Sequence, residues 1–178
     1  MGSASHGPDL ELALPALEAV LRQRPEARVE LFGSVARLPV AEHLPAAVVR
    51  HPGVVGDYAA FRRRLLALDW DIGLAPLQAS PYNLCKTATK WVEYAEAGAA
   101  VLASDIEVYR PMIAEGAAAP ALPGQWSEML LKLVREPGLR RGLVAAADGL
   151  LRGRYGWDRL EESLLGLLAR AAMRRQAA

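Results

Sequence analysis

The sequence predicts an α/β fold: a Rossmann-like open parallel sheet with helices on both faces and a helical C-terminus. Short apolar segments bounded by Gly or Pro alternate with segments whose apolar residues recur every three or four positions. Strands that alternate with helices form parallel sheets covered on both faces. From residue 125 onward only the helical spacing continues, and a length of 178 residues suits one domain.

Gly, Pro and capping residues set the expected limits of each element. Residues 1–8 are small and polar, so we expect an unstructured start or a cloning remnant, with the domain spanning residues 9–178. Asp9 and Asp57 suit helix N-caps, while Pro15 marks a kink or a later helix start. We expect strands at 28–32, 47–49, 71–77 and 99–103, a loop at 39–45, and helices at 9–24, 57–68, 81–98, 106–113, 125–135, 137–152 and 157–174.

The composition argues against several classes of protein. Lys plus Arg is 21 and Asp plus Glu is 20, whereas dedicated nucleic-acid binders carry a clear basic excess. No apolar run approaches the ~18 residues that span a bilayer. The single cysteine, Cys85, excludes an intramolecular disulfide and fits a cytoplasmic setting. Three scattered histidines and one cysteine match no familiar zinc spacing, so we expect no metal.

Two polar segments follow predicted strands, at 77–90 and 104–110. In open α/β sheets, ligands bind beyond the carboxyl ends of the strands. Within the first segment Asn83 can cap the next helix, Lys86 falls in its first turn, and Lys90 lies one turn further on the same face. A lysine in a first turn opposes the helix dipole unless an anion or a carboxylate lies near it.

Glu93 extends this stripe, which has two interpretations. In the first, the lysines meet phosphate and the Glu93 carboxylate accepts hydrogen bonds from vicinal ribose or sugar hydroxyls. In the second, Lys86, Lys90 and Glu93 form a solvated helix face with an ion pair, which is the usual role of charge stripes. Cys85 has no histidine near it in the sequence and suits a small core residue better than a nucleophile.

Residues 71–105, DIGLAPLQASPYNLCKTATKWVEYAEAGAAVLASD, resemble the donor-binding core of the retaining, two-domain bacterial glycosyltransferases of family 4 (group 1). The likeness rests on DIGLAPL, SPYN, CKTATKWVEYAEAG and AAVLASD in this order and spacing, followed by Tyr109. Weaker likeness runs from residue 2 to the C-terminal helices, so it covers nearly the whole chain.

The resemblance implies that this chain is the C-terminal, donor-binding half of an enzyme whose N-terminal half binds the acceptor. Glu93 falls where the family holds the donor ribose hydroxyls. Lys86 and Lys90 fall where the diphosphate lies, and they are the implied catalytic residues that stabilise the leaving group without a metal or cofactor. The other implied binding residues are Asn83, Ser104 and Tyr109.

The chain departs from the family pattern in two places. The family has Glu, seven residues, then Glu, and counting back from Glu93 the first position is Cys85. A thiol does not accept a hydrogen bond from a sugar hydroxyl as a carboxylate does, so Asn83 or backbone amides would bind that hydroxyl instead. The family's first donor-domain strand, which is central in the sheet, would precede Gly2. Its absence implies a gap or unpaired edges, which invites self-association.

The sequence therefore predicts the donor half of a glycosyltransferase that moves a sugar from a UDP- or GDP-linked donor to an acceptor hydroxyl with retention. The expected setting is cell-envelope polysaccharide or glycan synthesis, in the cytoplasm or at the inner face of the membrane. The expected partners are the nucleotide-sugar and the acceptor-binding domain, and we expect the chain alone to be inactive. The alternatives are a module of the same fold that binds nucleotides but has lost catalysis, and an unrelated doubly wound regulator.

Overall fold

Short parallel strands form the centre of the molecule. The computed structural model describes residues 1, 6–42, 44–45, 48–53 and 56–176. Within these residues the strands form two separate sheets. One sheet pairs β1 (Glu30–Phe32) with β2 (Val49–His51), and the other contains β3 (Ile72–Ala75), β4 (Ala100–Ser104) and β5 (Ala119–Ala121) in that order. Every strand pairing is parallel.

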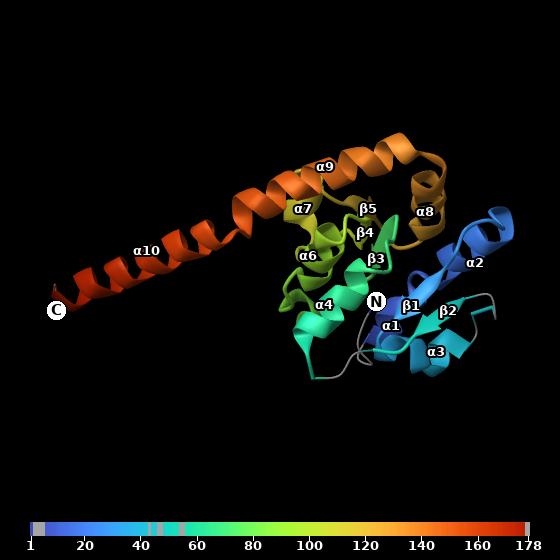
Figure 1. Cartoon of the computed structure of the whole chain (residues 1–178), viewed down its shortest axis with the longest axis horizontal. Coiled ribbons are helices and arrows are strands. Elements are labelled where there is room, and N and C mark those ends of the chain that lie inside the picture. The colour runs from blue at the N-terminus through green and yellow to red at the C-terminus, as the bar shows by residue number, and fades with distance from the viewer. Residues whose placement is uncertain (2–5, 43, 46–47, 54–55, 177–178) are drawn as a thin grey trace.

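Helices connect the strands and form the C-terminal part of the chain (Figure 1). They are α1 (Gly7–Glu11), α2 (Leu14–Gln23), the 3-10 helix η2 (Ser34–Arg37), α3 (Pro39–Glu42), α4 (Tyr58–Leu66), α5 (Pro81–Leu84), α6 (Thr89–Glu96), α7 (Arg110–Ala114), α8 (Trp126–Arg135), α9 (Pro137–Arg154) and α10 (Trp157–Gln176).

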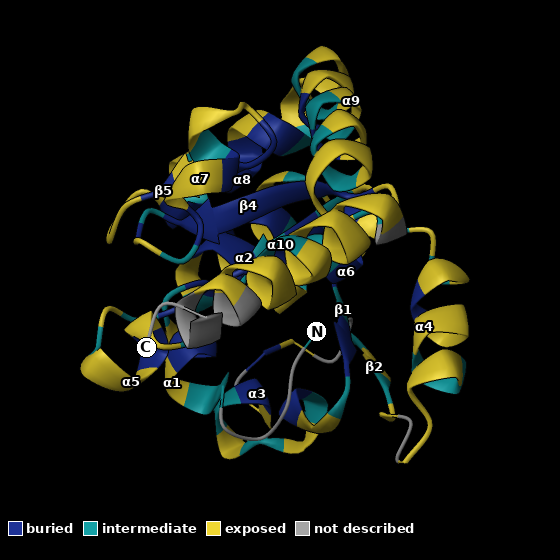
Figure 2. Cartoon of the chain, turned by 90° about the vertical axis from the view of Figure 1, so that its left-hand side faces the viewer, coloured by how far each residue is buried: buried dark blue, intermediate teal, exposed yellow. Residues whose placement is uncertain are grey.

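Helices cover both faces of the strands. On one face, Leu102 of β4 packs in a cluster with the apolar sides of α2 and α8. On the other face, Val101 packs in a cluster that includes residues of α6, α7 and α9. All residues of β4 are buried, as in a strand enclosed on both faces of a parallel sheet (Figure 2). The predicted parallel α/β arrangement with helices on both faces and a helical C-terminus is confirmed.

The close approach of α6 to β3 depends on Gly73. A Cβ atom at this position would lie 2.4 Å from the ring of Tyr94. Tyr94 is almost completely buried, so its ring has little room to move. A glycine is required here because any side chain would displace the tyrosine.

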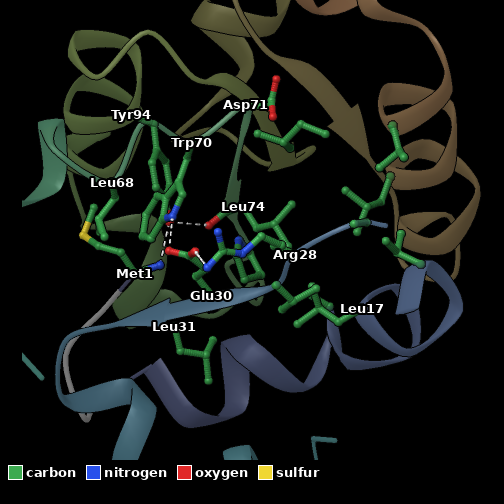
Figure 3. A pocket seen from close by; sticks show the side chains of 18 of the residues that line it. Met1, Leu17, Arg28, Glu30, Leu31, Leu68, Trp70, Asp71, Leu74 and Tyr94 are labelled. Carbon is green, nitrogen blue, oxygen red and sulfur yellow. Dashed lines mark hydrogen bonds and ion pairs between the residues drawn. The ribbon is translucent and has the colours of Figure 1, made fainter. Parts of the chain in front are cut away.

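The strands that the structure describes form two small sheets instead of one continuous sheet. In the part of the chain that the structure describes, β1 pairs with β2 alone and β3 pairs with β4 alone, so each of the two sheets has an unpaired edge there. These are the unpaired edges that the resemblance implies. A cavity of about 490 Å³ lies between them, lined by residues of β1, β3, α2 and α8 and by Tyr94 (Figure 3). We call this cavity the interstrand slot.

Several elements differ from the predicted ones. Residues Pro39–Glu42 form the helical turn α3 where a loop was predicted, since proline is compatible with a first helical turn. The predicted helix from Pro81 to Gly98 is broken into α5 and α6. Strand β5 was not predicted, because Ala119–Ala121 lack the branched and aromatic residues that mark strands. Residues 2–5 of the expected unstructured start and Ala47 of the expected strand lie outside the described residues.

Helix α10 extends away from the rest of the molecule (Figure 1). Its helical register is as predicted, and its leucines recur at helical spacing. They are exposed to between 54% and 59%, so this apolar stripe is not buried against the described part of the chain. The stripe consists of Leu160, Leu164, Leu165, Leu167 and Leu168.

Candidate functional site

The candidate site lies beyond the carboxyl ends of β3 and β4, where ligands bind in open α/β sheets. Ser104 ends β4, and its buried hydroxyl oxygen accepts a hydrogen bond from the Leu77 N–H (2.8 Å). This contact fixes the loop after β3 against the end of β4. Ser104, a predicted ligand contact, therefore holds the loop in place in this structure.

The turn into α5 is capped by a different residue from the predicted one. The Ser80 hydroxyl oxygen accepts a hydrogen bond from the Asn83 N–H (3.1 Å), so Ser80 is the N-cap, and the prediction of Asn83 in that role is wrong. The helix begins earlier because Pro81 fits its first position. The buried Asn83 side chain donates from Nδ2 to the Gln78 carbonyl (2.9 Å) and to Asp9 Oδ1 (3.1 Å).

Asp9 joins the first helix to this loop. It was predicted as an N-cap, but α1 begins at Gly7 and Asp9 lies buried within it. Besides the bond from Asn83, its carboxylate accepts a hydrogen bond from the Gln78 N–H (2.8 Å) and lies 2.7 Å from His6 Nδ1. Asp9 and His6 are the site residues that sequence reasoning missed, because both contacts of Asp9 with the loop join residues far apart in the chain.

The break between α5 and α6 changes the place of Lys86. It lies in the connection between the two helices, so its predicted position in a first helical turn is wrong. The Lys86 ammonium is 4.0 Å from Asp9 Oδ2 and lies over the Tyr82 ring, with its nitrogen 4.9 Å from the ring centroid. From the sequence we expect either a bound anion or a nearby carboxylate beside this lysine, and Asp9 is that carboxylate.

A cavity of about 400 Å³ opens at the N-terminus of α6, where no side-chain hydrogen bond caps the helix. We call it the α6 cavity. Of the predicted site residues, Lys86, Lys90 and Tyr109 line it together, whereas Asn83, Glu93 and Ser104 do not. The full lining is His6, Leu77, Cys85, Lys86, Thr87, Thr89, Lys90 and Tyr109.

The α6 cavity carries more positive than negative groups. Burial lowers the pKa of Lys90 to about 8; the Asp9 carboxylate opposes this shift, and the Lys86 charge adds to it. Burial also lowers the pKa of His6, while its contact with Asp9 acts in the opposite direction. Two cationic side chains, a histidine and a helix N-terminus meet here, an arrangement that favours an anion.

Glu93 is buried on α6, three residues after Lys90. Burial raises the pKa of its carboxyl group, while the Met1 ammonium, the Tyr58 hydroxyl and Lys90 oppose that shift. Lys90 and Glu93 therefore share one helix face, as predicted. Asn83 and Lys86 precede α6, so the predicted single stripe from Asn83 to Glu93 is wrong.

Cys85 is exposed and lines the α6 cavity, which corrects its expected place in the core. It follows directly after α5, where the chain turns toward the surface instead of continuing as a helix. Its thiol is therefore in contact with the same cavity as Lys86. Tyr109, in contrast, is buried beside the cavity, and burial raises the pKa of its hydroxyl.

No protein-family model matches the chain, and no curated protein matches it either. Across residues 1, 6–42, 44–45, 48–53 and 56–176, no group of three or more His, Cys, Asp or Glu residues is placed to hold a metal ion. The helices that the structure describes include none that is both long and apolar enough to cross a membrane.

Proposed function

We propose that this chain binds the diphosphate of a UDP- or GDP-linked sugar in the α6 cavity and is the donor half of a retaining glycosyltransferase. An acceptor-binding domain completes the enzyme. The observation that carries the proposal is the gathering of His6, Lys86 and Lys90 at the uncapped N-terminus of α6. The resemblance of residues 71–105 to the donor-binding core of family 4 supplies the substrate class.

A diphosphate suits the charges around the α6 cavity. The Asp9 carboxylate already accepts hydrogen bonds from Gln78 and Asn83, and it lies beside His6 and 4.0 Å from the Lys86 ammonium. Lys90 remains a cation in a partly buried place that lowers its pKa, so a bound anion would stabilise its charged form. Backbone N–H groups of an uncapped helix turn favour phosphate in the same way.

The transfer reaction gives Lys86 and Lys90 a role beyond binding. The bond between the anomeric carbon and the diphosphate oxygen breaks, the acceptor oxygen bonds to that carbon, and the acceptor proton is released. Negative charge develops on the departing diphosphate. Ammonium groups and helix N–H groups already placed around the cavity stabilise that charge without reorganising.

Calorimetric titration with UDP, GDP, their sugar conjugates and inorganic pyrophosphate tests the proposal. We expect Lys86→Met and Lys90→Met each to weaken both the preferred nucleotide and pyrophosphate at least tenfold, or about 1.4 kcal/mol. The matched control is Lys132→Met, because Lys132 is exposed on α8 and does not line the cavity. If the folded chain binds none of these ligands, or if Lys132→Met has the same effect, the proposal is wrong.

Glu93 belongs to the same proposal as the group that holds the ribose hydroxyls. It lies three residues further along α6 than Lys90 and does not line the cavity that would hold the diphosphate. We therefore expect Glu93→Gln to weaken nucleotide binding and to leave pyrophosphate binding unchanged. Equal losses for both ligands would contradict a ribose contact.

A second candidate function is nucleotide binding without catalysis. Cys85 favours it, because its thiol lines the cavity at the position where family 4 has its first glutamate. In a full-length enzyme assay, Cys85→Glu would raise sugar transfer if the thiol had replaced a catalytic carboxylate. Sugar transfer by the wild-type full-length protein would exclude this second function.

A further inference from the structure

Helix α10 has an apolar stripe that no other element in the described part of the chain covers. Leu160, Leu164, Leu167 and Leu168 are spaced as i, i+4, i+7 and i+8, so they lie on one side of the helix. Each is more than half exposed. Most of the stability of a helix in a protein comes from packing its apolar face, and contiguous exposed apolar patches mark interaction sites. The stripe is therefore a surface that suits a partner.

The charges of α10 are divided between its two halves. The first half, residues 157–166, has three acidic residues and one basic residue, which are Asp158, Glu161, Glu162 and Arg159. The second half, residues 167–176, has three basic residues and no acidic one, which are Arg170, Arg174 and Arg175. One end of the helix is thus negative and the other end is positive.

This division matches a second copy of the same helix in antiparallel order. Antiparallel pairing places the negative half of each helix beside the positive half of the other, and it also brings opposite ends of the two helix dipoles together. Parallel pairing would place like charges side by side. Both orders bring the leucine stripes into contact, so the charges decide between them.

The position of α10 in the molecule agrees with the antiparallel order. The helix extends away from the strands (Figure 1). Two antiparallel copies would therefore have their remaining structures at opposite ends of the helix pair, where they do not collide. Such a pair has two-fold symmetry, and each copy contributes the same surface, as in most dimers of identical chains.

An anionic membrane surface fits α10 less well than a second copy does. Helices that lie on such surfaces carry Lys and Arg along their polar face. In α10 the acidic residues of the first half would be repelled there. A second copy covers the apolar stripe and complements both charged halves at once.

We propose that α10 is a self-association surface, which pairs in antiparallel order with α10 of a second copy of this chain. The paired leucine stripes exclude water, and the negative and positive halves set the direction. The inference does not depend on nucleotide binding, because the residues that line the α6 cavity lie outside α10. The contacts lie between copies, so the stability of one chain does not depend on them well below the dissociation constant.

Sedimentation equilibrium of the full chain, over a roughly hundredfold range of micromolar concentrations, tests the proposal. A reducing agent prevents cross-linking through the exposed Cys85. We expect a reversible monomer–dimer equilibrium. We expect Leu164→Asp with Leu167→Asp to weaken the dimer at least tenfold, whereas Leu84→Asp on exposed α5 leaves it unchanged. A dimer that persists after removal of residues 157–178 would show association through another surface, such as a strand edge, and would overturn the proposal.

Charge reversal tests the direction of the pair. One variant combines Glu161→Lys with Glu162→Lys, which makes both halves of α10 positive. The other combines Arg170→Glu, Arg174→Glu and Arg175→Glu, which makes both halves negative. We expect each variant alone to lose the dimer and an equal mixture of the two to regain it. A wild-type chain that stays monomeric, reversals without effect, or a mixture that stays monomeric would contradict the proposal.

Discussion

Lys90 is a single side chain whose burial is expected to oppose stability. It is partly buried, and burial lowers its pKa from an ordinary value of 10.5 to about 8. Its charged form is therefore less stable in the native protein than in the unfolded chain. Such a residue persists where a ligand compensates for its cost, so the free protein is expected to gain stability when Lys90 is lost.

We predict that Lys90→Met raises the free energy of unfolding at pH 7 and that this gain shrinks as the pH rises. Below the native pKa of about 8, Lys90 is charged in both states and the native state bears the full cost of burial. Between about 8 and 10.5 the unfolded chain binds more protons, so wild-type stability rises with pH. Urea unfolding of both proteins from pH 7 to pH 10.5 measures the difference.

Lys132→Met is the control for this pH series, since Lys132 is exposed on α8. We expect the difference in free energy of unfolding between wild type and Lys132→Met to stay constant as the pH rises over the range used for Lys90→Met. A difference between wild type and Lys90→Met that does not change with pH would contradict the lowered pKa.

Residue type alone predicted the N-cap of one helix correctly and the N-caps of two others wrongly. Asp57 was predicted as an N-cap, and its carboxylate does accept a hydrogen bond from the Ala60 N–H (3.1 Å). Asn83 and Asp9 have the same capping chemistry, yet in the structure both are buried and bonded to each other. Residue type gives the capacity for a cap, but only the tertiary structure decides which partner is used.

At the scale of elements, the contact of α1 with the loop after β3 organises the candidate site. Gln78 and Asn83 both donate to the Asp9 carboxylate, and His6 lies beside it. These bonds hold the loop that leads into α5 and the connection that carries Lys86. The position of the α6 cavity is therefore coupled to the position of α1.

We predict that Asp9→Ala lowers the free energy of unfolding by about 1.5–3 kcal/mol, the range for hydrogen bonds to charged groups. The loss arises because the partly buried Gln78 N–H loses its acceptor and the buried Asn83 side chain loses one of its two acceptors. Chemical denaturation measures it, with Glu11→Ala on the exposed side of the same helix as the control. Equal stability of the two variants would show that Asp9 does not tie α1 to the loop.

Helices and strands were predictable where the apolar residues of the sequence recur at a clear helical spacing or form a clear apolar segment. Strand β4 follows from a short, fully apolar segment, and helices α8 and α9 follow from apolar residues that recur at helical spacing. The helix from Pro81 to Gly98 was predicted in one piece because its spacing continues across residues 85–88, where the structure breaks it. The break depends on the Ser80 cap and the contacts of Asp9, which no local period contains.

At the scale of the whole molecule, α10 stands apart from the remaining structure (Figure 1). We predict that removing residues 157–178 changes the free energy of unfolding by less than about 0.5 kcal/mol, as expected for surface changes. Far-UV circular dichroism should lose the signal of this helix while the denaturation midpoint stays in place. Leu143→Ala on α9 is the positive control, because Leu143 is buried and such changes cost about 2–5 kcal/mol. A loss of that size on truncation would show that α10 contributes to the core.

The division into two sheets also belongs to this scale. Periodicity predicted most strands and their parallel direction, since strands alternate with helices. It contains no information about which edges meet, because pairing joins residues far apart in the chain. The slot between β1 and β3 was foreseen only through the resemblance, as a gap in the sheet, and its volume and lining required the structure.

The hydrogen bond between the Met1 amino group and Tyr94 has a practical consequence for attaching reporter groups. The amino end lies between β1 and β3, and burial lowers the pKa of its ammonium to about 5. A fluorophore coupled there would enter the middle of the molecule and disturb the structure that it is meant to report. The outer end of α10 lies far from the strands (Figure 1), so a dye or a surface linker attached there leaves both cavities accessible.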